Sequence, residues 1–284
     1  MAGETDVLRY SAFAATPEGG NPAGVVLDAQ GLSDEQMQRI AADVGFSETA
    51  FLVARTDDDG VPRYRARYWS PAAEVPFCGH ATVATAVALA ERDGAGDVVF
   101  DTNAGAVRLR STVDPEGGVT VSFTSVEPRV RELDPAVLDR LLALLGLTTA
   151  DLDERFPARE SFAGNWHPIV VVRDRELFDQ FRFSPAEVAA LMREQGWFGT
   201  STVLHIARPA DIDARNLFPV GRITEDPATG SAAASVGAYL RDLGHPATTV
   251  RIHQGAHVRR PSLLTVTIPP TGGIEVSGGA SLLT

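Results

Sequence analysis

Two segments of similar design, about half a chain apart, constrain the fold of this sequence most strongly. In each, a short loop leads directly into a helix of small, mostly apolar residues. The first loop is Phe77-Cys78-Gly79-His80-Ala81-Thr82, and the second is Glu225-Asp226-Pro227-Ala228-Thr229-Gly230-Ser231. A helix that is apolar on all sides is predicted to be buried. The sequence therefore predicts a duplicated α+β arrangement, in which strands surround one central buried helix in each half.

The two helix starts are candidate anion-binding sites. A helix start exposes backbone N–H groups and the positive end of the helix dipole. Gly79 and Gly230 stand at these starts and would let an anionic group approach the backbone closely. The alternative is that both helices are only well capped, with His80 and Ser231 as caps. Because the pattern occurs twice, we expect one ligand site between the two halves.

Alternating apolar residues predict strands around both helices. In the first half, strands are expected at 7–13, 23–27, 46–53, 63–69, 97–100, 106–112 and 119–123, with an amphipathic helix between Ser33 and Gly45. In the second half, strands are expected at 168–172, 202–207, 249–253, 263–268 and 274–276. Helices are expected to begin at Asp134 and Ser184.

A domain boundary is expected near Val126-Glu127-Pro128. It would give an N-terminal domain of residues 1–127 and a C-terminal domain of residues 128–284, with the last C-terminal strand joining the first domain. His167 and His245, each followed by a proline, are interpreted as turn residues.

Composition excludes several classes of function. The chain has 284 residues, with 25 basic and 37 acidic residues, and this net charge of −12 argues against nucleic acid or an anionic membrane as a partner. No apolar run is long enough to span a bilayer, and the N-terminus lacks the features of a signal peptide, so a cytoplasmic location is expected. The single cysteine excludes an internal disulfide and a cysteine-rich zinc site.

Cofactor chemistry is also restricted. The chain contains no lysine, which excludes a lysine Schiff base and with it an ordinary pyridoxal phosphate enzyme. No phosphate loop, dinucleotide fingerprint or metal-ligand spacing is present, so neither a cofactor nor a metal is expected. The use of arginine alone, with abundant alanine, suggests a GC-rich bacterial source.

Five ordered segments resemble motifs of the PhzF-like phenazine-biosynthesis family. They are Gly20-Asn21-Pro22-Ala23-Gly24-Val25, Phe46-Ser47-Glu48-Thr49-Ala50-Phe51, residues 71–82, Glu225 to Ser231, and Gln254-Gly255 with Arg260-Pro261-Ser262. The resemblance implies a diaminopimelate-epimerase-like fold: two pseudo-symmetric halves, each an antiparallel barrel-like sheet around a central buried helix, with the active site in the cleft between them. It also implies a homodimer. Arg259 stands where the family usually has glycine, so that loop is expected to be less flexible or to place a cation near the cleft.

The resemblance implies a carboxylate base rather than a pair of thiols. Epimerase and proline-racemase relatives use two cysteines, one at each helix start. This chain has only Cys78 and carries Asp226 in the second region, so racemisation by two thiols is excluded. Cys78 could gain thiolate character from the helix dipole, but a small buried apolar role is favoured. Glu48 matches the catalytic glutamate of the family, and a half-closed apolar cleft is expected to raise its pKa toward the range of a general base.

The remaining site residues are expected to assist this base. By resemblance, His80 and Asp226 would help to move protons and orient the substrate. Ser231 and the N–H groups around Gly79 and Gly230 would hold a substrate carboxylate. Asn21 and Ser47 are weaker candidates for substrate contact or for positioning Glu48. The structural alternative for Asp226 is a hydrogen bond within its own loop.

The leading hypothesis is a cofactor-independent isomerase that relocates a proton on a small carboxylate substrate. One alternative is an epimerase or lyase that acts on an amino or hydroxy acid, in which Cys78 would take part. The other is a non-catalytic protein that binds small carboxylates on the same scaffold.

Overall fold

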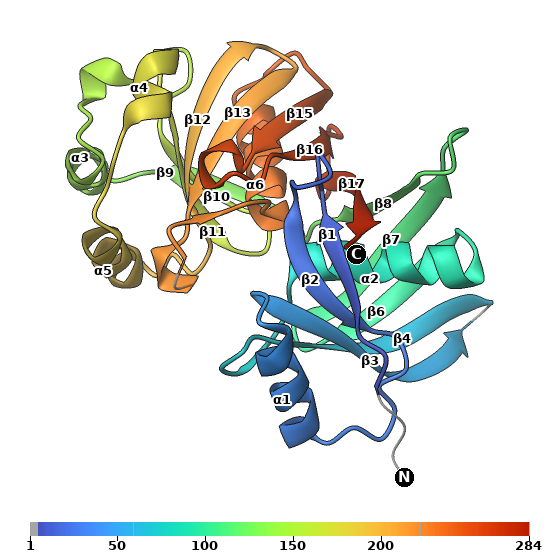
Figure 1. Ribbon diagram of the computed structural model, residues 1–284. Coiled ribbons are helices and arrows are strands. Elements are labelled where there is room, and N and C mark those ends of the chain that lie inside the picture. Colours follow the sequence, from blue (N-terminus) through green and yellow to red (C-terminus); the bar gives the residue numbers. More distant parts are fainter. Residues whose placement is uncertain (1–4, 59, 222, 284) are drawn as a thin grey trace. The chain divides into compact units, whose positions relative to one another are not determined.

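The computed structural model describes residues 5–58, 60–221 and 223–283, which form two compact units (Figure 1). Unit 1 consists of Met1–Thr124 and Ser277–Thr284, and unit 2 consists of Ser125–Val276. The second unit is therefore continuous in sequence, whereas the first is completed by the C-terminal end of the chain.

Unit 1 is a closed barrel. Its strands are β1 (Leu8–Ala12), β2 (Asn21–Val26), β3 (Glu48–Asp58), β4 (Val61–Trp69), β6 (Asp97–Thr102), β7 (Gly105–Val113), β8 (Val119–Thr124) and β17 (Glu275–Leu282). They pair in the order β1–β2–β3–β4–β6–β7–β8, and β17 closes the ring by pairing with both β8 and β1. The pairs β2–β3 and β4–β6 are parallel. A closed barrel leaves no unpaired sheet edge.

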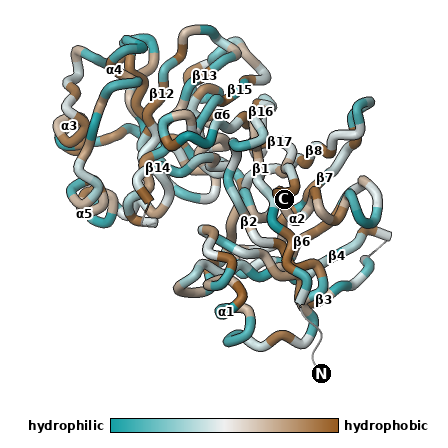
Figure 2. Tube along the Cα trace, in the orientation of Figure 1, coloured by the Kyte–Doolittle hydropathy of each residue, from teal (hydrophilic) through white to brown (hydrophobic). Residues whose placement is uncertain are grey.

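The helix α2 (Gly79–Asp93) is the core of this barrel. Residues 80–90 of α2 are all buried, as predicted from its lack of a polar face. It contacts β1, β2, β3, β7 and β8. In Figure 2, apolar residues colour much of α2 and β6, whereas the tip of the β7–β8 hairpin is hydrophilic. Small side chains on the helix allow the strands to approach it from several directions.

A second helix of unit 1, α1 (Asp34–Val44), packs on the sheet through Met37 and Ala41. Its predicted start is confirmed, because Ser33 and Gln36 form a capping box. Its predicted end is confirmed at Gly45, whose φ of 72° is left-handed.

Unit 2 repeats this topology. Its strands are β9 (Arg129–Glu132), β10 (Arg159–Phe162), β11 (Trp166–Val171), β12 (Ser201–Arg208), β13 (Asp211–Leu217), β15 (Thr249–Gln254) and β16 (Ser262–Thr267), paired in that order. The pairs β11–β12 and β13–β15 are parallel, which matches the positions of the two parallel pairs in unit 1. The helix α6 (Gly230–Asp242) is mostly buried and contacts β9, β10, β11 and β16.

The loop before each central helix contains a two-residue strand. In unit 1 this is β5 (Glu74–Val75), which pairs with the end of β4. In unit 2 it is β14 (Glu225–Asp226), which pairs with the end of β13. The duplication inferred from the two helix starts therefore extends to the strands that lead into them.

The other helices of unit 2 form a separate hydrophobic cluster. They are α3 (Pro135–Leu144), α4 (Arg175–Gln180) and α5 (Pro185–Gln195), and they pack with one face of β11 and β12. Asp134 caps α3 as predicted. Short 3₁₀ helices occur at Thr149–Asp151, Pro219–Gly221 and Ala256–Val258.

The interpretation of His167 as a turn residue is wrong. His167 lies inside β11 and is fully buried, with Pro168 paired to Glu160 on β10. The residue before a proline favours extended backbone, and here that preference leads into a strand. The turn lies earlier, at Gly164, whose φ is 121°.

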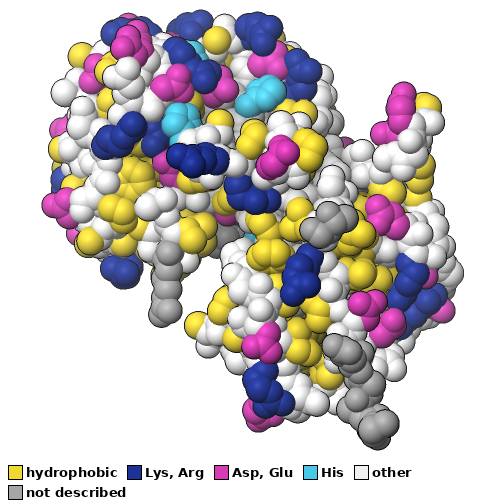
Figure 3. Space-filling view, in the orientation of Figure 1, with side chains coloured by type: hydrophobic (Ala, Val, Ile, Leu, Met, Phe, Trp, Pro, Cys, Tyr) yellow, Lys and Arg dark blue, Asp and Glu magenta, His cyan; other side chains and the backbone are white. Residues whose placement is uncertain are grey.

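Charged side chains of both signs are interspersed on the visible faces of both units (Figure 3). Many arginines pair with carboxylates, as in the bidentate contacts Arg63–Asp101 and Arg67–Glu74. Among the described residues, no helix is long and apolar enough to cross a bilayer.

Replacing Gly237 by alanine is expected to destabilise unit 2. A Cβ atom at this position of α6 would lie 2.6 Å from Ile274 Cγ2 and 2.8 Å from Val266 Cγ1. We expect a loss of about 1–3 kcal/mol in the free energy of unfolding, measured by urea denaturation. Gly96→Ala is the control, because no atom of the described residues would lie within 4 Å of a Cβ atom there. Equal effects of the two substitutions would contradict close packing around α6.

Candidate active site

The first candidate group lies in unit 1, where β2, β3 and the start of α2 meet. Asn21 opens β2 and Glu48 opens β3, and the two strands run parallel with Ala23 beside Glu48. Cys78 is the N-cap of α2, and His80 is the second residue of that helix. Residues far apart in sequence are thus brought to one end of the central helix.

His80 is at the centre of this group. Its Nε2 lies 3.5 Å from Glu48 Oε2 and 3.3 Å from Ser47 Oγ. Its Nδ1 lies 3.2 Å from Asn21 Nδ2. An amide nitrogen can only donate, so Nδ1 accepts this bond and the ring proton lies on Nε2, facing Glu48 and Ser47. Four of the residues predicted for the site therefore contact one another.

Cys78 also belongs to this group, although the sequence favoured a purely structural role. Its side chain is buried, and its thiol lies 3.5 Å from Glu48 Oε2, to which it donates, and 3.3 Å from His80 Nδ1. The side chain of Glu48 is 20% exposed, so its carboxylate can be reached from solvent. Glu48 therefore contacts both a thiol and an imidazole, two groups that can exchange protons.

The same three residues could hold a metal ion. Each residue offers one donor atom, and the three atoms, from Glu48, Cys78 and His80, all lie within 4.8 Å of one another. Oxygen, sulfur and nitrogen donors of this kind occur in zinc sites. Residue spacing gave no sign of this set, because Glu48 and Cys78 are 30 positions apart in sequence. The three groups also contact one another directly, so proton transfer among them requires no metal.

Both central helices begin without a capping side chain. The N-caps are Cys78 and Thr229, neither side chain accepts a capping hydrogen bond, and neither helix has an acidic residue in its first turn. The alternative role of His80 and Ser231 as caps is therefore wrong, because each is the second residue of its helix. The positive end of each dipole is not neutralised by its own first turn, which favours an anion there.

The second candidate group lies in unit 2, around the loop before α6. Asp226 Oδ2 accepts a hydrogen bond of 2.5 Å from Thr229 Oγ1, so this carboxylate does bond within its own loop. Gln254 Nε2 donates to the carbonyl oxygen of Asp226 at 2.6 Å and to Thr229 Oγ1 at 3.0 Å. The C-terminal motif that contains Gln254 therefore supports the loop that carries Asp226.

Gly255 is required beside this loop. Its φ is 81°, and a Cβ atom there would lie 2.2 Å from the carbonyl oxygen of Arg260 and 2.6 Å from that of Pro227. No other residue type fits so close an approach of three backbone segments.

Ser231 has a partner that the sequence did not reveal. Its Oγ lies 3.2 Å from Nε2 of His167, which β11 presents to the start of α6. Burial lowers the pKa of His167 from 6.5 to about 4, so the ring is neutral at pH 7. The signal in the sequence was a histidine at the start of an apolar strand, which the following proline disguised as a turn.

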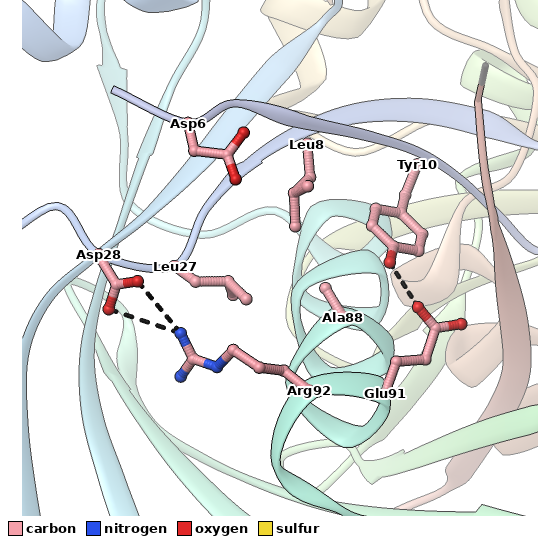
Figure 4. A pocket seen from close by; sticks show the side chains of 8 residues that line it. All are labelled: Asp6, Leu8, Tyr10, Leu27, Asp28, Ala88, Glu91 and Arg92. Atoms are coloured by element: carbon pink, nitrogen blue, oxygen red, sulfur yellow. Dashed lines mark hydrogen bonds and ion pairs between the residues drawn. The ribbon is translucent and has the colours of Figure 1, made fainter. Parts of the chain in front are cut away.

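A pocket in unit 1 lies near the other end of α2 and includes none of the predicted site residues (Figure 4). Four of its polar groups pair with one another: Tyr10 donates to Glu91, and Arg92 contacts Asp28. Glu91 is eleven residues beyond His80, about 16 Å along the helix axis. This pocket is therefore separate from the first candidate group.

Comparison with protein families gives one match along almost the whole chain. The model of the family described as "Phenazine biosynthesis-like protein" matches residues 10–283. An uncharacterized isomerase of Escherichia coli O157:H7 is 30% identical, covering 98% of this chain and 96% of that protein. An uncharacterized isomerase of Deinococcus radiodurans is 33% identical, covering 98% and 92%.

Solved structures give the same result. A phenazine biosynthesis protein of the PhzF family from Bacillus anthracis has a TM-score of 0.83 at 27% identity, covering 98% of this chain and 96% of that one. A predicted epimerase from Pseudomonas aeruginosa has a TM-score of 0.82 at 26% identity, covering 99% and 98%. A probable proline racemase from Agrobacterium radiobacter shares the fold, with a TM-score of 0.64 at 13% identity over 98% and 90%.

Arg259→Gly is expected to stabilise unit 2. Arg259 is exposed and has a left-handed φ of 59°, a conformation that disfavours side chains other than glycine. After the extra chain entropy of glycine is subtracted, we expect a gain of about 0.5–1 kcal/mol, measured by urea unfolding. Ala256→Gly in the same loop is the control and should lower stability, because Ala256 has no such strain. A loss of stability in Arg259→Gly would show that the arginine side chain stabilises the loop.

His167 is expected to make unit 2 sensitive to acid. Its pKa is lowered on folding, so the unfolded chain binds the proton more readily and stability falls as pH drops from above 6.5 toward 4. Between pH 7 and pH 5 this one group accounts for about 2 kcal/mol. Urea unfolding at both pH values should show that much less acid sensitivity in His167→Gln than in the unmodified protein. The same pH dependence in both would contradict a buried, neutral His167.

Proposed function

The chain belongs to the phenazine biosynthesis-like family, has the diaminopimelate-epimerase-like fold and is an isomerase; on this premise we propose that it relocates a proton on a small carboxylate substrate without a cofactor. The observation that carries the proposal is the contact of Glu48 with both Cys78 and His80 at the buried start of α2. We propose Glu48 as the general base and acid.

In the first step, Glu48 removes a proton from an activated carbon of the substrate. The C–H bond breaks, its electron pair is delocalised into the conjugated system, and the proton moves to the Glu48 carboxylate. In the second step, Glu48 returns the proton to a different carbon of that system, so that no atoms are gained or lost. General acid–base catalysis of this kind contributes about 10²–10⁴-fold to the rate.

His80 and its neighbours support this transfer. The Nε2–H of His80 faces Glu48 and Ser47, while Asn21 fixes the other side of the ring. This arrangement directs an N–H donor toward the carboxylate that is proposed to take the proton. Asp226, which is held by Thr229 and the Gln254 side chain, is proposed by family resemblance as a further acid–base residue.

Each helix start is proposed, by family resemblance, as a place where a substrate carboxylate can bind. Gly79 and Gly230 open the two helices, and Ser231 adds a hydroxyl group at the second. The absence of acidic residues from both first turns supports this role. Family resemblance further supports a homodimer.

Epimerisation of an amino or hydroxy acid is the second candidate reaction. It is favoured by the Cys78 thiol beside Glu48, since a thiol is a second group in the site that can return a proton to carbon. A non-catalytic role does not suit a chain of an isomerase family.

The test is proton exchange in deuterium oxide. Small unsaturated carboxylates and chiral amino and hydroxy acids are incubated with the enzyme, and the loss of carbon-bound protons is followed by NMR. Glu48→Gln should slow exchange by about 10²–10⁴-fold, because an amide cannot accept the proton. Glu35→Gln, on the exposed first turn of α1, should leave it unchanged. Undiminished exchange in Glu48→Gln would remove Glu48 from the role of base.

Two further measurements separate the alternatives. Cys78→Ser should keep the exchange of the isomerase reaction, whereas a loss equal to that of Glu48→Gln would favour epimerisation through the thiol. EDTA should leave the rate unchanged. A loss that Zn²⁺ restores would instead point to a metal held by Glu48, Cys78 and His80.

A further inference from the structure

We infer that His167 is a positioning residue, which holds the hydroxyl group of Ser231 in place at the start of α6 so that it can bind a substrate carboxylate. The inference rests on the proposed function of Ser231 and adds a residue that neither the motifs nor the family comparison indicated.

The strand β11 holds the ring of His167 in place for its contact with Ser231. β11 is a central strand of unit 2, paired with β10 on one side and β12 on the other. His167 has no exposed surface, so its ring cannot leave this position without disturbing the sheet. Its Nε2 lies 3.2 Å from Ser231 Oγ. A hydroxyl group can donate or accept, so this hydrogen bond forms in either neutral tautomer of the ring.

The far side of the ring is held by Thr200. The Thr200 N–H lies 3.0 Å from Nδ1, and the carbonyl oxygen and hydroxyl of the same residue lie at 3.0 Å and 3.1 Å. Gly199 allows this approach, because a Cβ atom there would lie 2.5 Å from Cε1 of His167. The imidazole is therefore enclosed, and only its Nε2 edge is directed toward α6.

The hydrogen-bond network around His167 continues toward Asp226, another proposed site residue of unit 2. The Thr200 hydroxyl donates to Asn216 Oδ1 at 2.8 Å, and the Thr202 hydroxyl donates to the same oxygen at 2.7 Å. Asn216 lies on β13 directly opposite Asp226 on β14. One buried set of polar groups thus links His167 with the strand pair that carries Asp226 into the loop before α6.

Burial also suits His167 to a positioning role rather than to acid–base chemistry. The low pKa of the buried ring keeps it neutral at pH 7, so it adds no charge beside the bound carboxylate. A fixed neutral partner orders the serine side chain before the ligand arrives. Preorganisation of this kind improves binding because less side-chain freedom is lost on association.

The test uses benzoate as a carboxylate probe and benzamide as its neutral control. Amide ¹H–¹⁵N NMR signals of Gly230, Ser231 and Ala232 are followed during titration of the folded full-length protein. Benzoate, but not benzamide, should shift these signals with saturation. Ser231→Ala should weaken benzoate binding about tenfold, which is the effect of losing one hydrogen bond to a charged group.

Two variants of His167 distinguish positioning from simple packing. The amide of asparagine can replace Nδ1 beside Thr200 but is too short to reach Ser231, whereas the longer glutamine side chain can reach it. His167→Asn should weaken benzoate binding about tenfold, and His167→Gln should retain it within about threefold. In the double variant His167→Asn/Ser231→Ala, binding should be no weaker than in Ser231→Ala alone, because His167 acts through the serine.

Three other outcomes would each overturn the inference. Additive losses in the double variant, or equal losses in the asparagine and glutamine variants, would overturn the role of His167 while leaving that of Ser231 intact. Unfolding of both His167 variants, seen as loss of amide dispersion, would overturn it in favour of a structural role. Normal benzoate binding by Ser231→Ala, or no binding by the unmodified protein, would overturn the proposed carboxylate site itself, and this inference with it.

Discussion

Close packing around two central helices is the constraint on which the rest of the structure depends. Each helix is made of small side chains, and the strands of its unit approach it so closely that an added methyl group at Gly237 would collide with two aliphatic side chains. Each helix is preceded by a two-residue strand that pairs with the end of an earlier strand. This pairing fixes the entry of the chain, and with it the position of the first-turn N–H groups.

The two units share a topology but differ in the chemistry that it carries. Both have two parallel strand pairs at matching positions, a short strand and a buried helix. At the start of α2, ionisable side chains contact one another directly, as in the contact of Glu48 with His80. At the start of α6, the neutral ring of His167 contacts Ser231, and the Asp226 carboxylate accepts a hydrogen bond from Thr229. A repeated backbone thus carries different side-chain chemistry at the start of each central helix.

Much of the fold and of the first candidate group could be predicted from the sequence. The buried helices were predictable because they lack a polar face, and α1 because Ser33 and Gln36 form a capping box within four residues. The group around His80 was predicted by family resemblance, and its members do contact one another. The fold and the isomerase class were predicted in the same way and are confirmed by the comparisons.

What the sequence concealed depends on contacts between distant segments. The thiol of Cys78 reaches Glu48 only because β3 and the start of α2 converge. His167 was obscured by the proline after it, since local sequence cannot distinguish a turn from an extended strand at that dipeptide. The strands β10 and β13 were missed because their polar residues, such as Glu160 and Arg215, are buried in ion pairs and hydrogen bonds that only the folded chain provides.

The closure of the unit 1 barrel by β17 has a consequence for how the protein is made. Tyr10 on β1 pairs with Leu282 on β17, so a strand that is synthesised early must wait for one that is synthesised much later. Until then β1 and β8 present open edges, which are prone to pairing with other chains. Unit 2 is continuous and can complete its sheet earlier. Unit 1 is therefore the later of the two units to complete its sheet, and a chain that lacks β17 would have an unsealed barrel.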